Sequence, residues 1–223
     1  MRYREADRIV TLYTRDRGRI GAIAKGVRRT KSKVGGRLEP FSLVRASLYS
    51  GRGLYTVVGV DTVRTFQGVR DELFRMEEGG RLVSAVRHLF PGEETSAPVF
   101  NLLVRGIARL AEAPDAAAAA GIVLAARLKL LALLGYAPEM SRCAGCGAEG
   151  PLYGFSPSLG GAVCSGCAET GTVACFALSG GAQATLCTLL QSPLAEVERL
   201  DLDDRATAEV EQVLAQTLAY HGH

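Results

Sequence analysis

The sequence predicts an α+β protein of more than one domain, in which a β-rich part precedes a helical part that carries a cysteine module. Up to about residue 66 the chain consists of short extended runs separated by glycine-bearing turns. Beyond that point apolar residues recur at the three- and four-residue spacing of helices, and two similar cysteine pairs lie between the helical stretches. We therefore expect domains over 1–66 and 67–223, with the cysteine module at about 139–175.

The composition is that of a globular protein with an apolar core, since 48% of the 223 residues are hydrophobic. The longest apolar stretch, 121–136, contains Arg127 and Lys129 and falls short of the ~20 residues that a bilayer-spanning helix needs. No apolar segment follows the basic residues at the N-terminus, so no secretory signal is expected. We predict a cytoplasmic location and no membrane contact.

Charge is distributed unevenly along the chain. Residues 1–70 contain 16 Lys/Arg and 5 Asp/Glu, a net charge of +11, whereas residues 71–223 carry a net charge of −8. The positive excess at the front predicts binding to a polyanion, which the acidic remainder would repel. The two parts of the chain are therefore expected to have different partners.

Four strands are expected in the β-rich part, and we expect them to be antiparallel. They cover 9–14, 19–25, 42–49 and 54–65. The first two flank Asp16-Arg17-Gly18, a hairpin signal, and the last two flank Gly51-Arg52-Gly53. The third run alternates its faces and the fourth is rich in Val and Thr, as strands are.

A basic segment, 26–40, separates the second and third expected strands. It cannot bury itself and predicts an exposed loop. Its Lys31-Ser32 resembles the end of a phosphate-binding P-loop, but the glycines that this motif requires are replaced by Lys25 and Thr30. The loop suits the phosphates of a nucleic acid, and a merely solvated charge run is the alternative. Nearby aromatic residues suited to bases are Tyr13, Phe41, Tyr49 and Tyr55.

Five helices are expected after the strands. They cover 71–89, 96–113, 115–135, 179–191 and 204–220. The third begins at Asp115, a good N-cap, and ends at Gly135. It is apolar on nearly every face, which predicts that it forms the centre of a helical domain.

The motif with the strongest signal is a pair of C-x-x-C knuckles, Cys143-Ala-Gly-Cys146 and Cys164-Ser-Gly-Cys167, separated by 17 residues. Zn²⁺ prefers four thiolates in a tetrahedron, and cytosolic thiols stay reduced rather than forming disulfides. The runs 152–156 and 162–163 between the knuckles resemble the hairpin strands of a zinc ribbon. A site with four thiolates has no open position, so we predict a structural Zn²⁺ held by these four cysteines.

Buried free thiols, a redox pair and an iron–sulfur cluster are the alternatives for this motif. A thioredoxin-type pair needs one C-x-x-C at a strand-to-helix junction, whereas two are present here among glycine-rich turns. The spacing is also unlike that of ferredoxins. Cys175 and Cys187 are left over, and we expect them to pack as small hydrophobic residues.

Catalytic constellations are scarce in this sequence. The only histidines are His88, His221 and His223, so a Cys–His or Ser–His dyad has little to build on. We therefore predict no catalytic residue and no enzyme. A zinc-dependent enzyme is the alternative, and it would require an open ligand position on the metal.

Several stretches, in order over most of the chain, carry a resemblance to a known family. They are Glu5-Ala-Asp-Arg-Ile-Val-Thr-Leu, Gly18-Arg-Ile, Ala24-Lys-Gly-Val-Arg-Arg, Gly36-Arg-Leu-Glu-Pro-Phe-Ser-Leu, Leu134-Gly-Tyr-Ala-Pro, Cys143-x-x-Cys-Gly, Phe155-Ser-Pro and Gly160-Gly-Ala-Val-Cys. In these stretches the sequence resembles the RecO family of bacterial DNA repair proteins. The resemblance implies an N-terminal OB-fold barrel, a helical bundle and an inserted zinc module with the four cysteines as ligands.

The resemblance also implies a function in DNA repair and recombination. Such a protein binds single- and double-stranded DNA, anneals complementary strands and works with RecR and the single-strand-binding protein so that RecA can load, which implies association with the nucleoid. The DNA-binding positions that carry over are Lys25, Arg28, Arg29, Lys31, Lys33 and Arg37. The acidic tail of the single-strand-binding protein would meet Arg105 and Arg109. The alternative function is a protein-interaction adaptor of the repair machinery whose DNA binding is incidental.

The sequence departs from the family at both ends. Relatives usually begin with an extra strand before the stretch that starts at Glu5, so we expect the barrel to lack its first strand or the start codon to be assigned too late. Without that strand the barrel would be open, with an edge prone to aggregation. Relatives also tend to continue with a basic stretch after the last helix, whereas this chain stops at His223, which predicts weaker DNA affinity.

Overall fold

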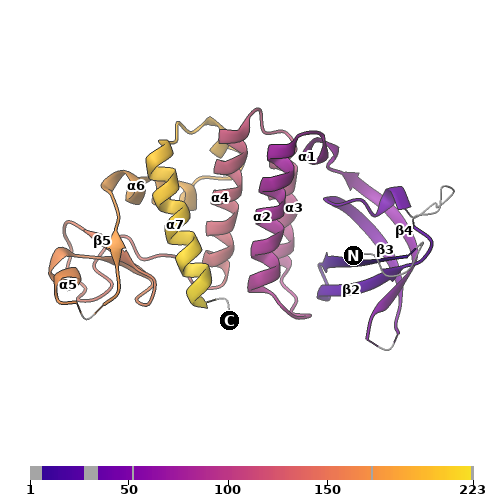
Figure 1. Cartoon of the computed structure of the whole chain (residues 1–223), viewed down its shortest axis with the longest axis horizontal. Coiled ribbons are helices and arrows are strands. Elements are labelled where there is room, and N and C mark those ends of the chain that lie inside the picture. Colours follow the sequence, from indigo (N-terminus) through magenta and orange to yellow (C-terminus); the bar gives the residue numbers. More distant parts are fainter. Residues whose placement is uncertain (1–6, 28–34, 52, 172, 222–223) are drawn as a thin grey trace. The chain divides into compact units, whose positions relative to one another are not determined.

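The chain forms two compact units, Met1–Glu112 and Ala113–His223, in the computed structural model. The structure describes residues 7–27, 35–51, 53–171 and 173–221. Within these residues the first unit contains strands β1–β4 and helices α1–α3, and the second contains helices α4–α7 and strands β5–β7 (Figure 1). The change from strands to helices that the sequence predicts near residue 66 is confirmed.

The first unit is built on a four-stranded sheet with the order β1-β2-β4-β3. Its strands are β1 (Arg8–Thr14), β2 (Gly18–Ala24), β3 (Ser42–Tyr49) and β4 (Tyr55–Thr65). The pairs β1/β2 and β3/β4 are antiparallel, as expected, but β2 and β4 are parallel over Ala22–Ala24. The expectation of a fully antiparallel sheet is therefore wrong at its centre. A long connection follows β2, and such a connection allows β4 to lie beside β2 in the same direction.

The sheet is not a closed barrel. Among the described residues β1 pairs only with β2, and β3 pairs only with β4, so both are edge strands. The sheet is thus open in this part of the chain, the arrangement expected of a barrel without its first strand, because no described strand joins the two edges. The OB-fold itself stays a prediction.

The core of the first unit lies along β2 and β4. Ala22, Ala24, Val57 and Val60 are buried together, and partly buried side chains from β1 and β3 pack against them. The alternation of buried and half-buried residues along β2 is the two-residue period of a strand.

Helices α1 (Gln67–Asp71), α2 (Leu73–Leu89) and α3 (Ala97–Leu110) complete the first unit. Ser96 caps α3 by accepting a hydrogen bond from the Val99 N–H at 3.4 Å. The turn after β1 packs tightly against the segment before α3, because a Cβ on Gly18 would lie 2.2 Å from the Glu94 carbonyl oxygen. Gly18 also has φ +58°, so this position requires glycine on two grounds.

The second unit is organised around α4 (Ala116–Leu133), as the sequence predicts. Asp115 caps this helix by accepting a hydrogen bond from the Ala118 N–H at 2.8 Å, and Gly135 follows it with φ +81°. Ten of its residues are buried, and it packs against α6 (Gly180–Gln191) and α7 (Asp204–His221). Among the described helices, α4 is the one that is long and apolar enough to cross a membrane. A helix buried in the core of a globular protein can have the same length and hydropathy, so these two properties do not distinguish the two cases.

Both cations of α4 have partners inside the second unit. The Arg127 guanidinium forms an ion pair with the Glu211 carboxylate of α7. The Lys129 ammonium donates to the Leu190 carbonyl, and burial lowers the pKa of this lysine. These contacts explain how two charges lie within an otherwise apolar helix.

Candidate metal centre and nucleic-acid interface

The cysteine module is a small sheet with one C-x-x-C knuckle before its first strand and the other directly after its second strand. Its strands β5 (Gly154–Ser156), β6 (Gly161–Val163) and β7 (Phe176–Ala177) have the order β6-β5-β7, and helix α5 spans Ser165–Glu169. The predicted hairpin is confirmed as β5 and β6, whereas the two-residue β7 was not predicted. The fully buried Phe155 packs against Phe176 with ring centroids 5.7 Å apart, which gives the module its own apolar centre.

The structure brings all four predicted metal ligands together. The Sγ atoms of Cys143, Cys146, Cys164 and Cys167 lie within 4.8 Å of one another, and those of Cys146 and Cys164 are 3.8 Å apart. In a tetrahedron of sulfurs around Zn²⁺, with Zn–S distances of about 2.3 Å, neighbouring sulfurs lie about 3.8 Å apart. The four sulfurs therefore have the number that a tetrahedral metal ion requires, and they lie close enough together to hold one.

Backbone hydrogen bonds hold the first knuckle beside the second. Gly147, with φ +75°, donates its N–H to the Cys143 carbonyl at 2.8 Å and so closes the first turn. The Ala144 N–H donates to the Ala162 carbonyl at 2.8 Å, which ties this knuckle to β6 just before Cys164. A Cβ on Gly145 would lie 3.1 Å from the Cys167 sulfur, so this position must be small.

Contacts within the cluster shift the pKa values of two of the four cysteines, Cys143 and Cys167, in opposite directions. Hydrogen bonds from the backbone N–H groups of Cys164, Cys146 and Gly145 lower the pKa of Cys143 to about 6. The pKa of Cys167 is raised to about 12, because its side chain is within hydrogen-bonding reach of the other three sulfurs, which favours its protonated form, and because it is partly desolvated and lies beside Cys143. Four adjacent sulfurs that include one thiol with a lowered pKa fit a soft divalent metal ion, whose positive charge stabilises neighbouring thiolates.

The remaining cysteines lie outside this cluster. Cys175 and Cys187 are half-buried free thiols, which agrees with the expectation that they pack as small side chains.

Of the six predicted DNA-binding residues, two lie in the described part of the chain. Arg28, Arg29, Lys31 and Lys33 fall outside the described residues. Lys25 is exposed in the turn that follows β2. Arg37 lies in the short 3-10 helix Gly35–Arg37, where its guanidinium donates to the Val60 carbonyl at 2.7 Å and lies 3.8 Å from the Asp61 carboxylate. Arg37 therefore also fixes the end of the basic segment to β4.

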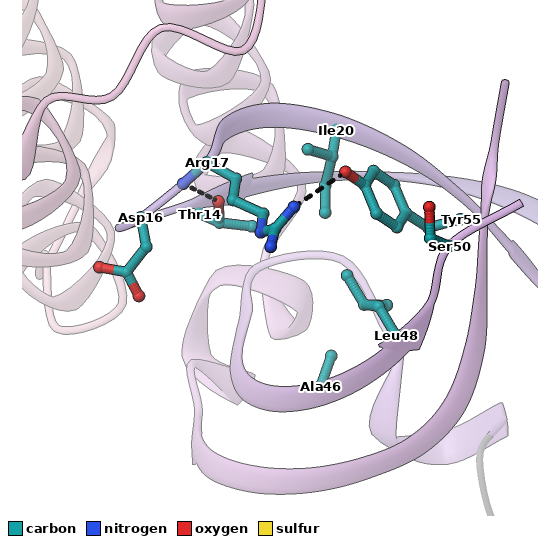
Figure 2. Close-up of a pocket in the computed structure, with 8 residues that line it drawn as sticks. All are labelled: Thr14, Asp16, Arg17, Ile20, Ala46, Leu48, Ser50 and Tyr55. Carbon is teal, nitrogen blue, oxygen red and sulfur yellow. Dashed lines mark hydrogen bonds between the residues drawn. The ribbon is translucent and has the colours of Figure 1, made fainter.

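The structure adds a cleft that the sequence did not reveal (Figure 2). Its volume is about 350 Å³, and it lies between the turn after β1 and the ends of β3 and β4 that face this turn. The Arg17 guanidinium donates to the Tyr55 hydroxyl at 3.1 Å and lies 5.9 Å from the centroid of its ring. The sequence marked Arg17 only as part of a turn and Tyr55 only as one of several aromatic residues, since their pairing spans 38 positions.

The other aromatic residues that the sequence offered for bases have different surroundings. Tyr49 is 69% exposed on β3. The ring of Tyr13 contacts that of Phe90, and burial raises the pKa of its hydroxyl. Phe41 has φ +60° and its ring lies against Gly79 of α2. Tyr49 is thus exposed to solvent, whereas Tyr55 is half-buried against the sheet core and lines the cleft with the rest of its surface.

Arg105 and Arg109, suggested for an acidic peptide, both lie on α3. Arg105 is exposed, whereas Arg109 forms an ion pair with Glu112 at 3.1 Å. Arg105 therefore offers the more accessible charge of the two.

These observations define a two-unit α+β protein that joins an open, cation-bearing sheet to a helical unit with a four-cysteine, metal-type site. The family model "Recombination protein O N terminal" matches residues 1–66, and "Recombination protein O C terminal" matches residues 73–222. The chain belongs to the recombination protein O (RecO) family, a family of recombination mediators in DNA repair.

Relatives named "DNA repair protein RecO" match along nearly the whole chain. The protein from Rubrobacter xylanophilus is 40% identical over 199 residues, covering 88% of this chain and 79% of that relative. The protein from Symbiobacterium thermophilum is 33% identical over 217 residues, covering 96% of this chain and 85% of the relative. The one from Pelotomaculum thermopropionicum is 38% identical over 219 residues, with coverage of 97% and 83%. The family resemblance that the sequence motifs indicate is thereby confirmed.

Proposed function

We propose that this protein binds single- and double-stranded DNA and anneals complementary strands, as a non-enzymatic mediator of recombinational repair. The observation that carries the proposal is the net charge of +11 on residues 1–70 of a chain that belongs to the RecO family. Such an excess is typical of a surface that binds phosphates, and the acidic remainder of the chain cannot supply one. The residues proposed to contact DNA are Lys25, Arg28, Arg29, Lys31, Lys33 and Arg37.

The proposed mechanism is electrostatic. Cations on one loop displace counterions from two strands at once, which lowers the repulsion between the strands while their bases pair. Lys25, just before the basic segment, is exposed after β2, and Arg37, within the segment, is bonded to the Val60 carbonyl of β4, so both of these described cations lie beside the sheet. No covalent bond forms or breaks in this process, which is why the proposal requires no catalytic residue.

We further propose that the four cysteines hold a structural Zn²⁺. Bound there, the ion supplies positive charge that allows four adjacent thiolates, and its binding free energy contributes to folding. The backbone N–H groups around Cys143 and the small residue Gly145 orient the sulfurs. With all four positions taken by protein sulfur, the ion has no site left for a substrate.

The proposed partners are RecR, the single-strand-binding protein and, indirectly, RecA, in the cytoplasm at the nucleoid. The acidic tail of the single-strand-binding protein would meet exposed Arg105, with Arg109 one helical turn away. Loading of RecA onto DNA coated with the single-strand-binding protein is the step that these contacts would serve.

An adaptor that acts mainly through protein contacts is the second candidate. It is favoured by an apolar stripe on α2, where Leu73, Met76 and Val83 are 71%, 42% and 40% exposed at helical spacing. Such a protein would bind its partners without annealing DNA.

An annealing assay with complementary fluorescent oligonucleotides distinguishes the two candidates. We expect the full chain to accelerate annealing, and the variant with Arg28, Arg29, Lys31 and Lys33 changed to Ala to lose most of that acceleration. A control with Arg81, Arg87, Arg199 and Arg205 changed to Ala removes the same charge elsewhere and should anneal like the wild type. No acceleration by the wild type, or equal loss in both variants, would favour the adaptor.

A further inference from the structure

The cleft between the turn after β1 and the strands β3 and β4 combines three kinds of surface (Figure 2). Ile20, Ala46 and Leu48 supply apolar side chains, of which Ile20 is buried. Thr14 and Ser50 add hydroxyl groups, and Tyr55 adds an aromatic ring. A nucleotide has the same three parts, namely a flat apolar base, a polar sugar and an anionic phosphate.

Arg17 and Asp16 are the two charged residues that line the cleft, and Arg17 is the positive one. Its guanidinium has no carboxylate partner within ion-pair distance among the described residues, and Figure 2 shows the neighbouring Asp16 carboxylate turned away from it. The hydrogen bond to the Tyr55 hydroxyl uses one of the five N–H donors of a guanidinium, so donors remain for an anion. The backbone N–H of Arg17 donates to Thr14 Oγ1 at 3.0 Å, which fixes the turn that carries this cation.

We infer that this cleft binds one unpaired nucleotide of single-stranded DNA, with the base against Tyr55 and the phosphate at Arg17. The inference rests on the proposed function, because it names the form of DNA that one part of the surface recognises. A base can stack on an aromatic side chain only when it is not stacked within a duplex, whereas Lys/Arg contacts to phosphate serve both forms. A volume of about 350 Å³ lies near the lower end of the range for ligand-binding cavities, about 300–1,000 Å³, which suits a single nucleotide.

The cleft and the basic segment are expected to recognise different features of DNA. Cations of that segment hold phosphates of any strand, so they add affinity without distinguishing single strands from duplexes. In the cleft, by contrast, Arg17 lies beside the Tyr55 hydroxyl, so we expect it to meet the phosphate of a nucleotide whose base has left the duplex to stack on Tyr55. The preference for single strands over duplexes is therefore expected to depend on these two residues.

Fluorescence anisotropy with the full chain tests this inference, using a labelled oligothymidylate and a hairpin duplex of equal charge as probes. We expect Tyr55→Leu to weaken binding to oligothymidylate by roughly tenfold, the scale of one base-stacking contact, and to leave duplex binding nearly unchanged. Arg17→Gln should weaken single-strand binding more than the control Arg87→Gln, which removes the same charge from an exposed position on α2. Tyr55→Phe keeps the ring and should retain most of the affinity.

A crosslinking experiment on the wild type makes the test independent of variant folding. Oligonucleotides that contain 5-iodouracil are irradiated in complex with the protein, and the modified residue is identified by mass spectrometry. We expect the adduct on Tyr55. Adducts only on other residues, or equal losses for single strands and duplexes in the Arg17 and Tyr55 variants, would overturn the inference while leaving general DNA binding intact. A wild type that binds neither probe would overturn the proposed function as well.

Discussion

The backbone N–H of Cys164 donates to the Sγ of Cys143 at 3.3 Å, although the two residues lie 21 positions apart. This contact joins the two knuckles directly and stabilises a negative charge on Cys143. The fold of the module therefore favours one thiolate, at Cys143, beside three further sulfurs with which it can share a metal ion.

The first prediction concerns metal content and stability. We expect one Zn²⁺ per chain by elemental analysis, and Cys164→Ser to lower both this content and the thermal stability of the protein. Metal binding of this kind is worth about 10–16 kcal/mol in small zinc peptides at neutral pH, so its loss is expected to unfold the module. Cys187→Ser is the matched control, because Cys187 is a half-buried thiol outside the cluster. Equal metal loss in both variants would contradict the assignment.

The second prediction concerns pH. The pKa of Cys143 is lowered to about 6, so the stability that its thiolate contributes is fully present above its ordinary pKa of 9.0 and is lost as the pH falls through about 6. Metal affinity should decrease over the same range, because protons compete with the metal for sulfur. Metal release to a colorimetric chelator, followed during acidification, measures this. Release that does not change between neutral pH and pH 5 would contradict thiolate ligation.

The third prediction tests the packing around the sulfurs. A Cβ on Gly145 would lie 3.1 Å from the Cys167 sulfur, so Gly145→Ala should displace that ligand and weaken metal binding. In Gly166→Ala the added Cβ would lie 4.0 Å from the Cys164 sulfur, an ordinary contact. Because Gly166 lies in α5, alanine there should even favour the helix by up to about 1 kcal/mol. Competition titrations against a zinc indicator should separate the two variants, and equal affinities would show that the sulfurs are not confined as described.

The fourth prediction tests whether α4 is the core of the second unit. Leu128 is fully buried, and Leu128→Ala should lower the free energy of unfolding by about 2–5 kcal/mol. Leu133, on the same helix, is 48% exposed, so Leu133→Ala should cost much less. Urea denaturation of both variants measures the difference. Similar small effects would be inconsistent with a buried α4.

Local signals allowed most elements to be predicted from the sequence. The hairpin signals around Gly18 and Gly53 and the N-cap Asp115 each act within a few residues, and each lies where expected. The two C-x-x-C knuckles are themselves local motifs, and their short separation allows them to meet in one small module.

Features that depend on distant partners could not be predicted in the same way. The parallel pairing of β2 with β4 joins strands that are separated in sequence by a long connection and by β3, so no local signal in either strand indicates it. The Arg17–Tyr55 contact joins two residues whose local patterns indicate only a turn and a strand. The sequence indicates Arg37 only as a cation for DNA. In the structure its guanidinium also donates a hydrogen bond to the Val60 carbonyl, a contact that depends on β4 lying beside it.

The salt dependence of DNA binding tests the central claim most directly. The claim is that the front of the chain holds DNA through several phosphate contacts of the basic segment. We predict that changing Arg28, Arg29, Lys31 and Lys33 to Ala flattens the log–log slope of single-strand affinity against salt by about two to three, since each contact contributes about 0.7. A slope equal to that of the wild type would contradict this account and place the DNA-binding surface elsewhere.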